Sequence, residues 1–313
     1  MENQTAVSEF ILQGLTSVLG LQHFLFTLFL ILYMISVLGN GTIVAVVLAE
    51  PRLHTPMYFF LGNLSCLDIC YSTVTLPKIL AGFLSKHWSI SSSGCLVQLH
   101  FFHFLGSSEV ILLAVMAVHR CVAICNPLRY TVVMNKQVCL ILAVGTWTIG
   151  FFHALMHSFM TSQLRFCGPN HIQHFFCDIK PLLKLACSST RLNLILLNIV
   201  TSCIAMGTFV ITLLTYLYII TFLFLKVQSQ EGRRRAFSTC ASHLTVVALL
   251  YVPAIFNYTP PLVGVSSRTD MLVSLMYSVV TPVLNPLIYT LRNQEVKSAL
   301  RKLLFRKLIL GKV

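Results

Sequence analysis

Long stretches without charge are the feature of this sequence that most limits its fold. Five stretches contain no Asp, Glu, Lys or Arg: residues 10–49, 137–164, 192–225, 236–267 and 271–291. Residues 53–77 and 87–119 are also apolar, and each contains a single acid, Asp68 and Glu109. Each stretch can cross roughly 30 Å of hydrocarbon, which takes about 20 helical residues. The sequence therefore predicts seven membrane crossings.

Composition supports the same class. The chain is 56% hydrophobic and 10% charged, whereas soluble domains have roughly 25% charged residues. The apolar stretches lack the alternation of a barrel strand, so we expect an all-α membrane protein, a seven-transmembrane helix bundle. The expected spans are residues 22–49, 56–78, 95–125, 137–160, 192–225, 236–259 and 270–291.

The basic residues predict the orientation. With the C-terminus inside, 15 of the 22 Lys and Arg face the cytoplasm and 7 face outward, in agreement with the positive-inside rule. We therefore expect an extracellular tail at residues 1–21, a membrane domain at 22–291 and a cytoplasmic segment at 292–313. The net charge of +13 then lies mostly beside anionic lipid headgroups, and no nucleic-acid partner is needed to explain it.

The last segment, RNQEVKSALRKLLFRKLIL, places leucines on one helical face and basic residues on the other. This pattern is typical of a short amphipathic helix that lies on the inner membrane surface. A frayed basic tail is the alternative.

Four cysteines are expected on the outer side, where disulfides form: Cys95, Cys167, Cys177 and Cys187. Four cysteines allow three pairings, and the sequence alone does not choose among them. Asn3 begins a glycosylation sequon in the outer tail. The loop of about 30 residues between the fourth and fifth crossings is long enough to act as a lid over a cavity.

Several motifs, in order along the chain, resemble those of rhodopsin-like G-protein-coupled receptors. They are GN at 39–40, LHTPMYFFLGNLSCLD at 53–68, MAVHRCVAICNPLRY at 116–130, HFFCD at 174–178, TY at 215–216, RAFSTCASHL at 235–244 and PVLNPLIYTLRN at 282–293. PMYFFL, AFSTCASH and PLLKLACS are similar, more narrowly, to olfactory receptors of the tetrapod-type class.

The resemblance implies a function, partners and a location. It predicts a plasma-membrane receptor that binds a small odorant and activates a stimulatory olfactory G protein, which raises cyclic AMP. It also implies the disulfides Cys95–Cys177 and Cys167–Cys187. The G-protein-coupling residues that it implies are His119, Arg120, Cys121, Tyr216, Asn285, Pro286 and Tyr289.

Arg120 stands in an altered motif. The family triplet is Asp-Arg-Tyr, whereas this chain has His119-Arg120-Cys121. A histidine cannot neutralise the arginine as an aspartate does, and it repels the arginine when protonated. We expect weaker restraint of the resting state or poorer coupling, and a non-signalling decoy receptor is the alternative.

Asp68 and Glu109 are the two carboxylates at membrane depth. Such groups are costly in hydrocarbon and usually face a polar cavity or a cation. With Asn40 and Asn285 nearby in the bundle, they could bind Na⁺, as the resemblance also implies. The alternative is one acid kept protonated and bonded to the other. No other cofactor is expected.

The resemblance places the ligand among the outer halves of helices three, five, six and seven. The expected ligand-binding residues are Phe102, His103, Gly106, Ser107, Val110, Thr201, Ile204, Tyr251, Ala254, Ile255, Tyr258 and Ser278, with Val200 and Ala205 beside them. This mostly apolar set suits a small, volatile, weakly polar molecule.

Three other functions have weaker support in the sequence. His100 and His103 have metal-ligand spacing, so a copper-assisted thiol sensor is one alternative. No phosphate-binding loop, HExxH or nucleophile elbow supports an enzyme. Paired membrane acids can carry ions in a small-solute transporter, but the chain lacks the internal repeat that transporters often have.

Overall fold

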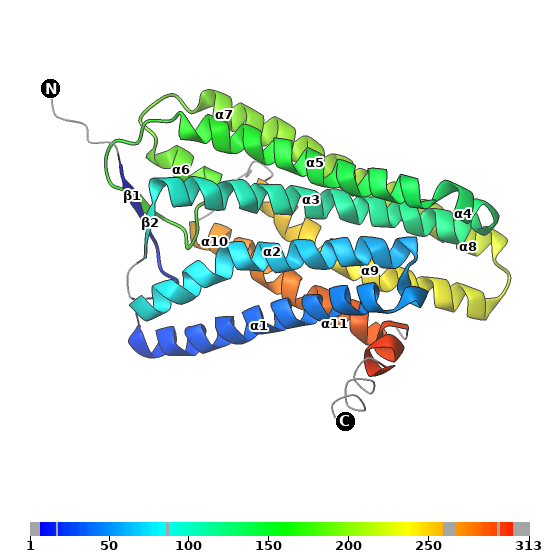
Figure 1. The fold of residues 1–313 in the computed structure, drawn as a ribbon. Coiled ribbons are helices and arrows are strands. Elements are labelled where there is room, and N and C mark those ends of the chain that lie inside the picture. The colour runs from blue at the N-terminus through cyan, green and yellow to red at the C-terminus, as the bar shows by residue number, and fades with distance from the viewer. Residues whose placement is uncertain (1–6, 17, 86–87, 259–266, 293–294, 303–313) are drawn as a thin grey trace.

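The computed structural model describes residues 7–16, 18–85, 88–258, 267–292 and 295–302. Helices run lengthwise beside one another and a small sheet closes one end (Figure 1). We call the end with the strands the sheet end. The opposite end, which has the short helix α4 (Tyr130–Val133), is called the α4 end.

Seven helical stretches in the described residues are long and apolar enough to cross a bilayer, which confirms the predicted number. Four of them are the single helices α1 (Leu19–Ala49), α2 (Pro56–Ser85), α3 (Ser92–Cys125) and α5 (Lys136–Ser162). The fifth combines α7 (Arg191–Leu196), the π-helical turn η3 (Leu197–Thr201) and α8 (Ser202–Lys226). The sixth is α9 (Gln230–Tyr258), and the seventh combines α10 (Ser267–Leu275), the π-helical turn η4 (Met276–Val280) and α11 (Thr281–Arg292).

Two helices run further than the apolar pattern predicts. Helix α2 continues past Lys78 to Ser85, and α9 begins at Gln230, before the basic run. A helix makes its own backbone hydrogen bonds and does not need hydrocarbon on all sides, so it can extend beyond the membrane. The ammonium of Lys78 donates a hydrogen bond to the carbonyl of Ser89 across the turn.

Local sequence sets the helix starts and the connections. The side chain of Ser91 accepts a hydrogen bond from the Gly94 amide at the start of α3, and Asn135 accepts one from the Val138 amide at the start of α5. The short elements between the crossings are η1 (Pro51–Leu53), η2 (Pro127–Arg129) and α6 (Ile179–Leu185). Residues 295–302 form a further short helix of about two turns, whereas residues 303–313 of the predicted amphipathic segment lie outside the described residues.

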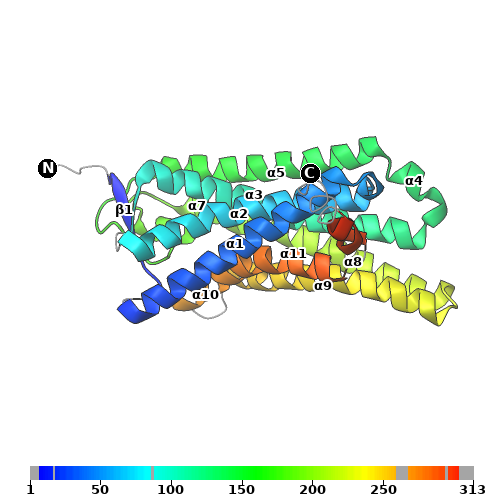
Figure 2. The same cartoon turned by 60° about the horizontal axis from the view of Figure 1, so that its bottom comes forward.

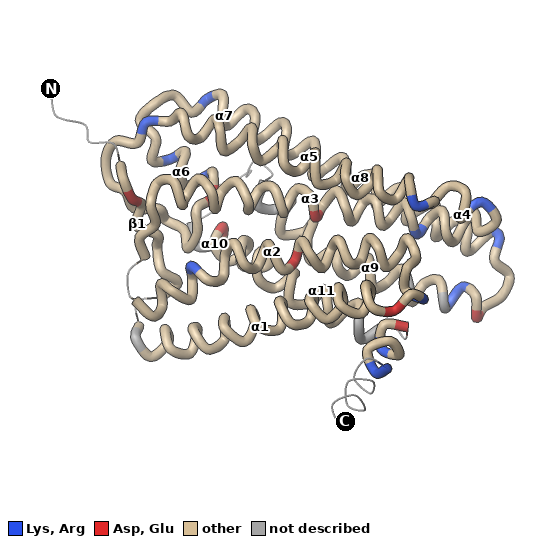
Figure 3. The backbone as a smooth tube through the Cα atoms, viewed as in Figure 1, with Lys and Arg blue, Asp and Glu red and all other residues tan. Residues whose placement is uncertain are grey.

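Helix α3 occupies the centre of the bundle. It packs against α2, α5, α8 and α9 (Figures 1 and 2). Its buried side chains include Glu109, His119 and Arg120, whereas a lipid-facing helix would bury only one stripe. Lys and Arg gather toward the ends of the bundle and are sparse along the helices between them (Figure 3). The centre of α3 is therefore where buried polar chemistry is concentrated.

Proline-freed carbonyls in the bundle receive side-chain donors. Pro286 has no N–H, so the carbonyl of Pro282 loses its helical partner. The amide of Asn40 in α1 donates to that carbonyl at 3.0 Å. Pro253 frees the carbonyl of Leu249 in the same way, and the hydroxyl of Thr281 lies 3.4 Å from it. Each bond joins the seventh crossing to another helix.

The sheet end is closed by segments far apart in sequence. Strand β1 (Glu9–Leu12) pairs antiparallel with β2 (Ser89–Ser91) and parallel with β3 (His171–Ile172). Phe10 and Leu12 alternate inward and are 2% exposed. Part of the expected 1–21 tail is therefore a strand, which a scan for membrane-length apolar runs could not detect. Asn3, the predicted glycosylation site, lies outside the described residues.

Asn40→Ala should lower the apparent melting temperature of the purified protein in detergent. The change leaves the Pro282 carbonyl buried without a donor, which costs about 1–3 kcal/mol. Thr42→Ala is the matched control, because Thr42 is exposed and bonds only within its own helix. An Asn40→Ala protein that melts with the Thr42→Ala protein would show that this bond does not stabilise the bundle.

Candidate functional site

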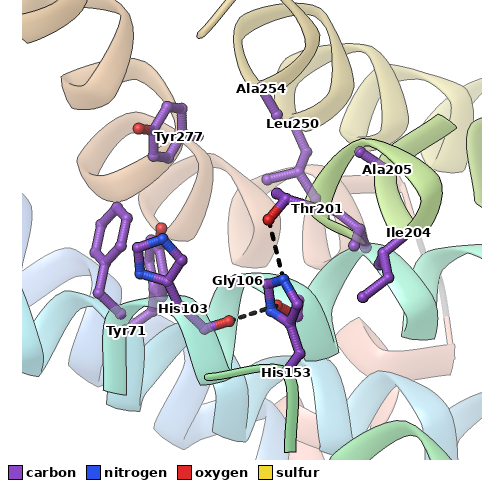
Figure 4. A pocket seen from close by; sticks show the side chains of 13 residues that line it. Tyr71, His103, Gly106, His153, Thr201, Ile204, Ala205, Leu250, Ala254 and Tyr277 are labelled. Atoms are coloured by element: carbon purple, nitrogen blue, oxygen red, sulfur yellow. Dashed lines mark hydrogen bonds between the residues drawn. The ribbon is translucent and has the colours of Figure 1, made fainter. Parts of the chain in front are cut away.

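A cavity of about 70 Å³ lies within the bundle. Its lining residues on α3, Phe102 to Val110, run from the half of that helix nearer the sheet end to its middle. Since one buried water needs roughly 10–15 Å³, the cavity has room for roughly five water-sized groups. Thirteen residues line it (Figure 4): Tyr71, Phe102, His103, Gly106, Ser107, Val110, His153, Thr201, Ile204, Ala205, Leu250, Ala254 and Tyr277. No acid is among these described lining residues.

One side of the cavity is aromatic. The Phe102 ring stacks on Tyr71 with centroids 5.1 Å apart and contacts Phe176 at 4.4 Å. Phe176 belongs to the long loop after α5, and its neighbour Cys177 is bonded to Cys95 at the start of α3. The disulfide therefore holds an aromatic side chain of the loop against the cavity wall.

The loop is fixed at two further points. A second disulfide joins Cys167 to Cys187, so both pairings implied by the resemblance are present. His174 is buried and stacks on Phe175, and burial lowers the pKa of its imidazole to about 4 despite nearby Asp178. Burial also lowers the pKa of Lys180 in α6. The loop packs as a folded lid, not as an extended connection.

The other side of the cavity carries a hydrogen-bonded chain of hydroxyls and histidines. Ser107 Oγ lies 2.7 Å from His153 Nδ1, and His153 Nε2 lies 3.1 Å from Thr201 Oγ1 (Figure 4). His157 Nε2 completes a triangle, 3.2 Å from both His153 Nε2 and Thr201 Oγ1. Thr201 ends the π-helical turn η3, and such turns commonly reposition side chains at functional sites.

The expected ligand residues divide into two groups. Nine line the cavity: Phe102, His103, Gly106, Ser107, Val110, Thr201, Ile204, Ala205 and Ala254. Tyr251 lies beneath it, where its hydroxyl donates to the Val110 carbonyl at 2.9 Å. Ser278 donates to its own helix at the Ser274 carbonyl, and Ile255 packs against the core. The side chain of Tyr258 is not among those described.

Sequence reasoning missed four of the lining residues: Tyr71, His153, Leu250 and Tyr277. His153 and His157 are four apart in an otherwise charge-free helix, and this spacing could have indicated a polar face directed into the bundle. Tyr71 and Tyr277 carry no comparable signal, because an aromatic residue in an apolar helix is usually packing.

The two membrane carboxylates lie close to each other and next to the cavity, since Glu109 stands between the lining residues Ser107 and Val110 on α3. Asp68 accepts hydrogen bonds from Asn285 Nδ2 at both oxygens, each at 3.0 Å, and the charge of Glu109 acts on it. Glu109 Oε1, Asn285 Oδ1 and Asn40 Oδ1 are buried without a hydrogen-bond partner among the described residues. Asp68, Glu109 and Asn285 form a cluster of buried oxygen acceptors from α2, α3 and α11.

Arg120 is buried at the α4 end of α3, 4% exposed. The hydroxyl of Tyr216 on α8 lies 2.7 Å from His243 Nδ1 on α9, so a hydrogen bond joins the two helices at this level. Tyr289 of α11 is also buried, and its hydroxyl has no partner among the described residues. Cys121 packs against an apolar cluster that contains Ala117, Tyr216 and Cys240.

His119 stands where the family triplet has an aspartate, and its side chain bonds to Tyr130. Its Nε2 lies 2.8 Å from the hydroxyl of Tyr130 in α4, and its ring meets Phe60 edge to face. Burial raises the pKa of Tyr130, so this phenol keeps its proton. The histidine therefore joins α3 to the connecting loop.

The two histidines with metal-ligand spacing have separate surroundings. His100 bonds Ser158 at 3.0 Å and packs against Phe101 and Phe151, whereas His103 lines the cavity. Within the described residues, no group of three or more His, Cys, Asp or Glu side chains could hold a metal ion. The copper-assisted alternative gains no support from this geometry.

Comparisons with known proteins match this arrangement. A family described as "Olfactory receptor" matches residues 29–307. Human olfactory receptor 12D1 is 62% identical over 98% of this chain and 96% of its own length. Human olfactory receptor 12D2 is 60% identical over 98% of this chain and 100% of its own length.

Among solved structures, squid rhodopsin superposes with a TM-score of 0.72. It covers 92% of this chain and 81% of its own at 18% identity, so it supports the fold. The full-length matches, the seven crossings and the ordered motifs agree. The chain therefore belongs to the olfactory receptor family, shares the fold of rhodopsin, and is a signalling receptor, not an enzyme.

Proposed function

We propose that this receptor binds a small, volatile, weakly polar odorant in the cavity near the sheet end. The observation that carries the proposal is the cavity itself, a space within the bundle lined mostly by aromatic and aliphatic side chains, with a few hydrogen-bonding histidines and hydroxyls among them. A buried apolar space with a few converging polar groups is the usual form of a small-molecule site.

Occupancy would be relayed to a G protein at the α4 end. Tyr251 of α9 bonds the carbonyl of Val110, a lining residue of α3, so a ligand that displaces Val110 also acts on α9. Tyr216 and His243 join α8 to α9 further along, beside buried Arg120. A ligand that binds better to the state with α9 moved outward shifts the population toward that state.

The partner would be the stimulatory olfactory G protein, and the product signal cyclic AMP. The receptor would lie in the plasma membrane with its N-terminus outside and its C-terminus inside, as the basic residues predict. A glycan at Asn3 would then be on the outer face. Two alternatives remain outcomes of the test: a non-signalling decoy and a small-solute transporter.

Gly106→Val should abolish or weaken the cyclic AMP response by at least about tenfold in EC50. A Cβ at Gly106 would meet Tyr71 at 3.5 Å, ordinary contact, so the larger side chain fills the cavity and not the helix interface. Gly145→Val is the matched control, because nothing lies within 4 Å of an added Cβ there. The response is measured in transfected cells, with surface expression quantified in parallel.

An unchanged EC50 in a surface-expressed Gly106→Val receptor would place the ligand elsewhere. Flux of the ligand without G-protein activation would favour the transporter. The first result tests where the ligand binds, and the second tests whether the protein is a receptor or a transporter.

His119→Asp should lower basal cyclic AMP and retain the ligand response. An aspartate beside Arg120 neutralises the guanidinium and can still accept a hydrogen bond from Tyr130. Tyr130→Phe should do the opposite, since losing one net hydrogen bond of about 1 kcal/mol shifts the resting-to-active ratio about fivefold. Basal and stimulated cyclic AMP are compared at matched surface levels.

Equal basal and stimulated signals in all three proteins would show that position 119 does not restrain the resting state. An unmodified receptor that stays silent, beside a His119→Asp variant that responds, would instead support the decoy. Because the two variants change basal activity in opposite directions, a general loss of expression cannot imitate the result.

We also propose that the carboxylate cluster binds Na⁺. Asp68, Glu109 and Asn285 offer buried oxygen acceptors, two of which, Glu109 Oε1 and Asn285 Oδ1, lack partners among the described residues. Oxygen ligands suit a hard cation, and the ion would supply positive charge beside the two acids. These residues would hold the ion, which would stabilise both carboxylates within the bundle.

NaCl should raise the apparent melting temperature relative to N-methylglucamine chloride at equal ionic strength, because a ligand that binds only the folded state stabilises it. Glu109→Gln should remove this difference. Glu9→Gln, at an exposed residue of strand β1, is the control and should keep it. A sodium-independent melting temperature in the unmodified receptor would favour the alternative, in which one acid is protonated and bonded to the other.

A further inference from the structure

The hydrogen bonds of the cavity's polar wall fix which of its atoms donate and which accept. It consists of His103, Ser107, His153 and Thr201, with His157 behind them. The three imidazoles are buried, with 4%, 6% and 1% exposure for His103, His153 and His157. No acid is among the described residues that line the cavity, and an unpaired buried charge is costly, so the neutral imidazoles are the relevant form.

The direction of each bond follows from the chemistry of its ends. Ser107 Oγ lies 2.5 Å from the carbonyl of His103. A carbonyl has no proton, so the serine donates its own. The bond between Ser107 Oγ and His153 Nδ1, 2.7 Å long, must then use the proton of the ring nitrogen. Neutral His153 is therefore protonated at Nδ1, and its Nε2 is a lone-pair acceptor.

His157 and Thr201 complete the chain. His157 Nε2 lies 3.2 Å from His153 Nε2, which carries no proton. Two lone pairs at this distance would repel each other, so His157 carries its proton on Nε2. Thr201 Oγ1 lies 3.1 and 3.2 Å from the two rings. All groups are satisfied when His157 donates to Thr201, Thr201 to His153, His153 to Ser107, and Ser107 to the carbonyl.

His103 is fixed independently. Its Nδ1 lies 3.1 Å from the carbonyl of Leu99, one turn earlier in α3. Only the ring nitrogen can donate in that pair, so neutral His103 has its lone pair on Nε2. The polar atoms of this wall therefore offer acceptors: His103 Nε2 and the remaining lone pairs of Ser107 and Thr201. Thr201 can turn its proton toward the cavity only by breaking its bond to His153.

From this wall we infer that the ligand is a hydrogen-bond donor, an alcohol or phenol, in preference to an aldehyde, ketone, ester or ether of the same skeleton. The inference rests on the proposed function and narrows it to a ligand class. A hydroxyl of the ligand donates to the wall, whereas a carbonyl or ether oxygen places lone pair against lone pair. A site built to bond a ligand hydroxyl discriminates strongly against analogues without it.

The remaining polar atoms of the cavity do not oppose this inference. The Tyr277 hydroxyl is hydrogen-bonded to Ser274 Oγ at 2.9 Å. The Tyr71 hydroxyl, across the cavity on α2, can donate or accept. This hydroxyl can donate to a carbonyl ligand. It belongs to the aromatic lining residues, so it does not replace the hydrogen bond that a carbonyl ligand fails to make with the polar wall.

The experiment measures cyclic AMP in cells that express the full-length receptor. Short-chain alcohols and small phenols are each compared with the aldehyde, methyl ketone and methyl ether of the same skeleton. We expect the hydroxyl compounds to be about 10- to 100-fold more potent, as expected when a buried polar group loses its partner. In His103→Phe the potency ratio should fall, because one wall acceptor is removed.

His100→Phe is the matched control, one turn away on the same helix, bonded to Ser158 and outside the cavity lining. It should keep the full preference for hydroxyl compounds. If His103→Phe fails to reach the cell surface, Ser107→Ala and Thr201→Val carry the same test and should each reduce the ratio.

Carbonyl compounds as potent as their alcohols in the unmodified receptor would overturn the inference and leave the odorant site standing. An unchanged ratio in surface-expressed His103→Phe and Ser107→Ala would also overturn it, because the wall would not be the contact. If no volatile of either class raises cyclic AMP at a surface-expressed receptor, the proposed function fails, and the ligand class with it.

Discussion

The scarcity of water within a bilayer governs most of what this structure does with its polar groups. Seven apolar helices satisfy their own backbones, and the exceptions are the carbonyls that proline frees. Asn40 and Thr281 donate to two of these, at Pro282 and Leu249, and both bonds involve the seventh crossing. The same requirement explains why buried serines, threonines and histidines bond either to a carbonyl of their own helix or to one another. The polar side of the cavity is one such chain, with its outermost members facing the ligand space.

These constraints also connect the two ends of the molecule. The cavity and the carboxylate cluster share one stretch of the central helix α3, where Glu109 lies between the lining residues Ser107 and Val110, and buried Arg120 lies further along the same helix. At each of these sites a hydrogen bond joins two helices of the bundle: Tyr251 to the Val110 carbonyl, Asn285 to Asp68, and Tyr216 to His243. A displacement at the cavity therefore changes contacts that are shared with α9 and α11.

The sequence predicted the architecture well because hydrophobicity and length carry that information. It placed all seven crossings, and resemblance supplied both disulfide pairings. The prediction of the cavity lining was incomplete, because it needed to know which helices pack against each other. His153 of α5 reaches the cavity only because α5 packs on α3, and Tyr71 and Tyr277 carry no signal that separates lining from packing. The extra length of α2 and the pairing of β1 could not follow from an apolar pattern, because neither depends on hydrocarbon.

The strand at residues 9–12 has a consequence for how the molecule is made. Its partners are residues 89–91 and 171–172, and the Asn170 side chain donates to the Glu9 carbonyl across 161 positions of chain. At a synthesis rate of roughly 5–20 residues per second, the earliest part of the chain waits roughly 8–30 s for its last neighbour to emerge. Until then the apolar cluster that buries Phe10 and Leu12 is incomplete, because it includes Ile172 and residues that follow it. The outer cap is therefore completed only after the first four crossings have been synthesised.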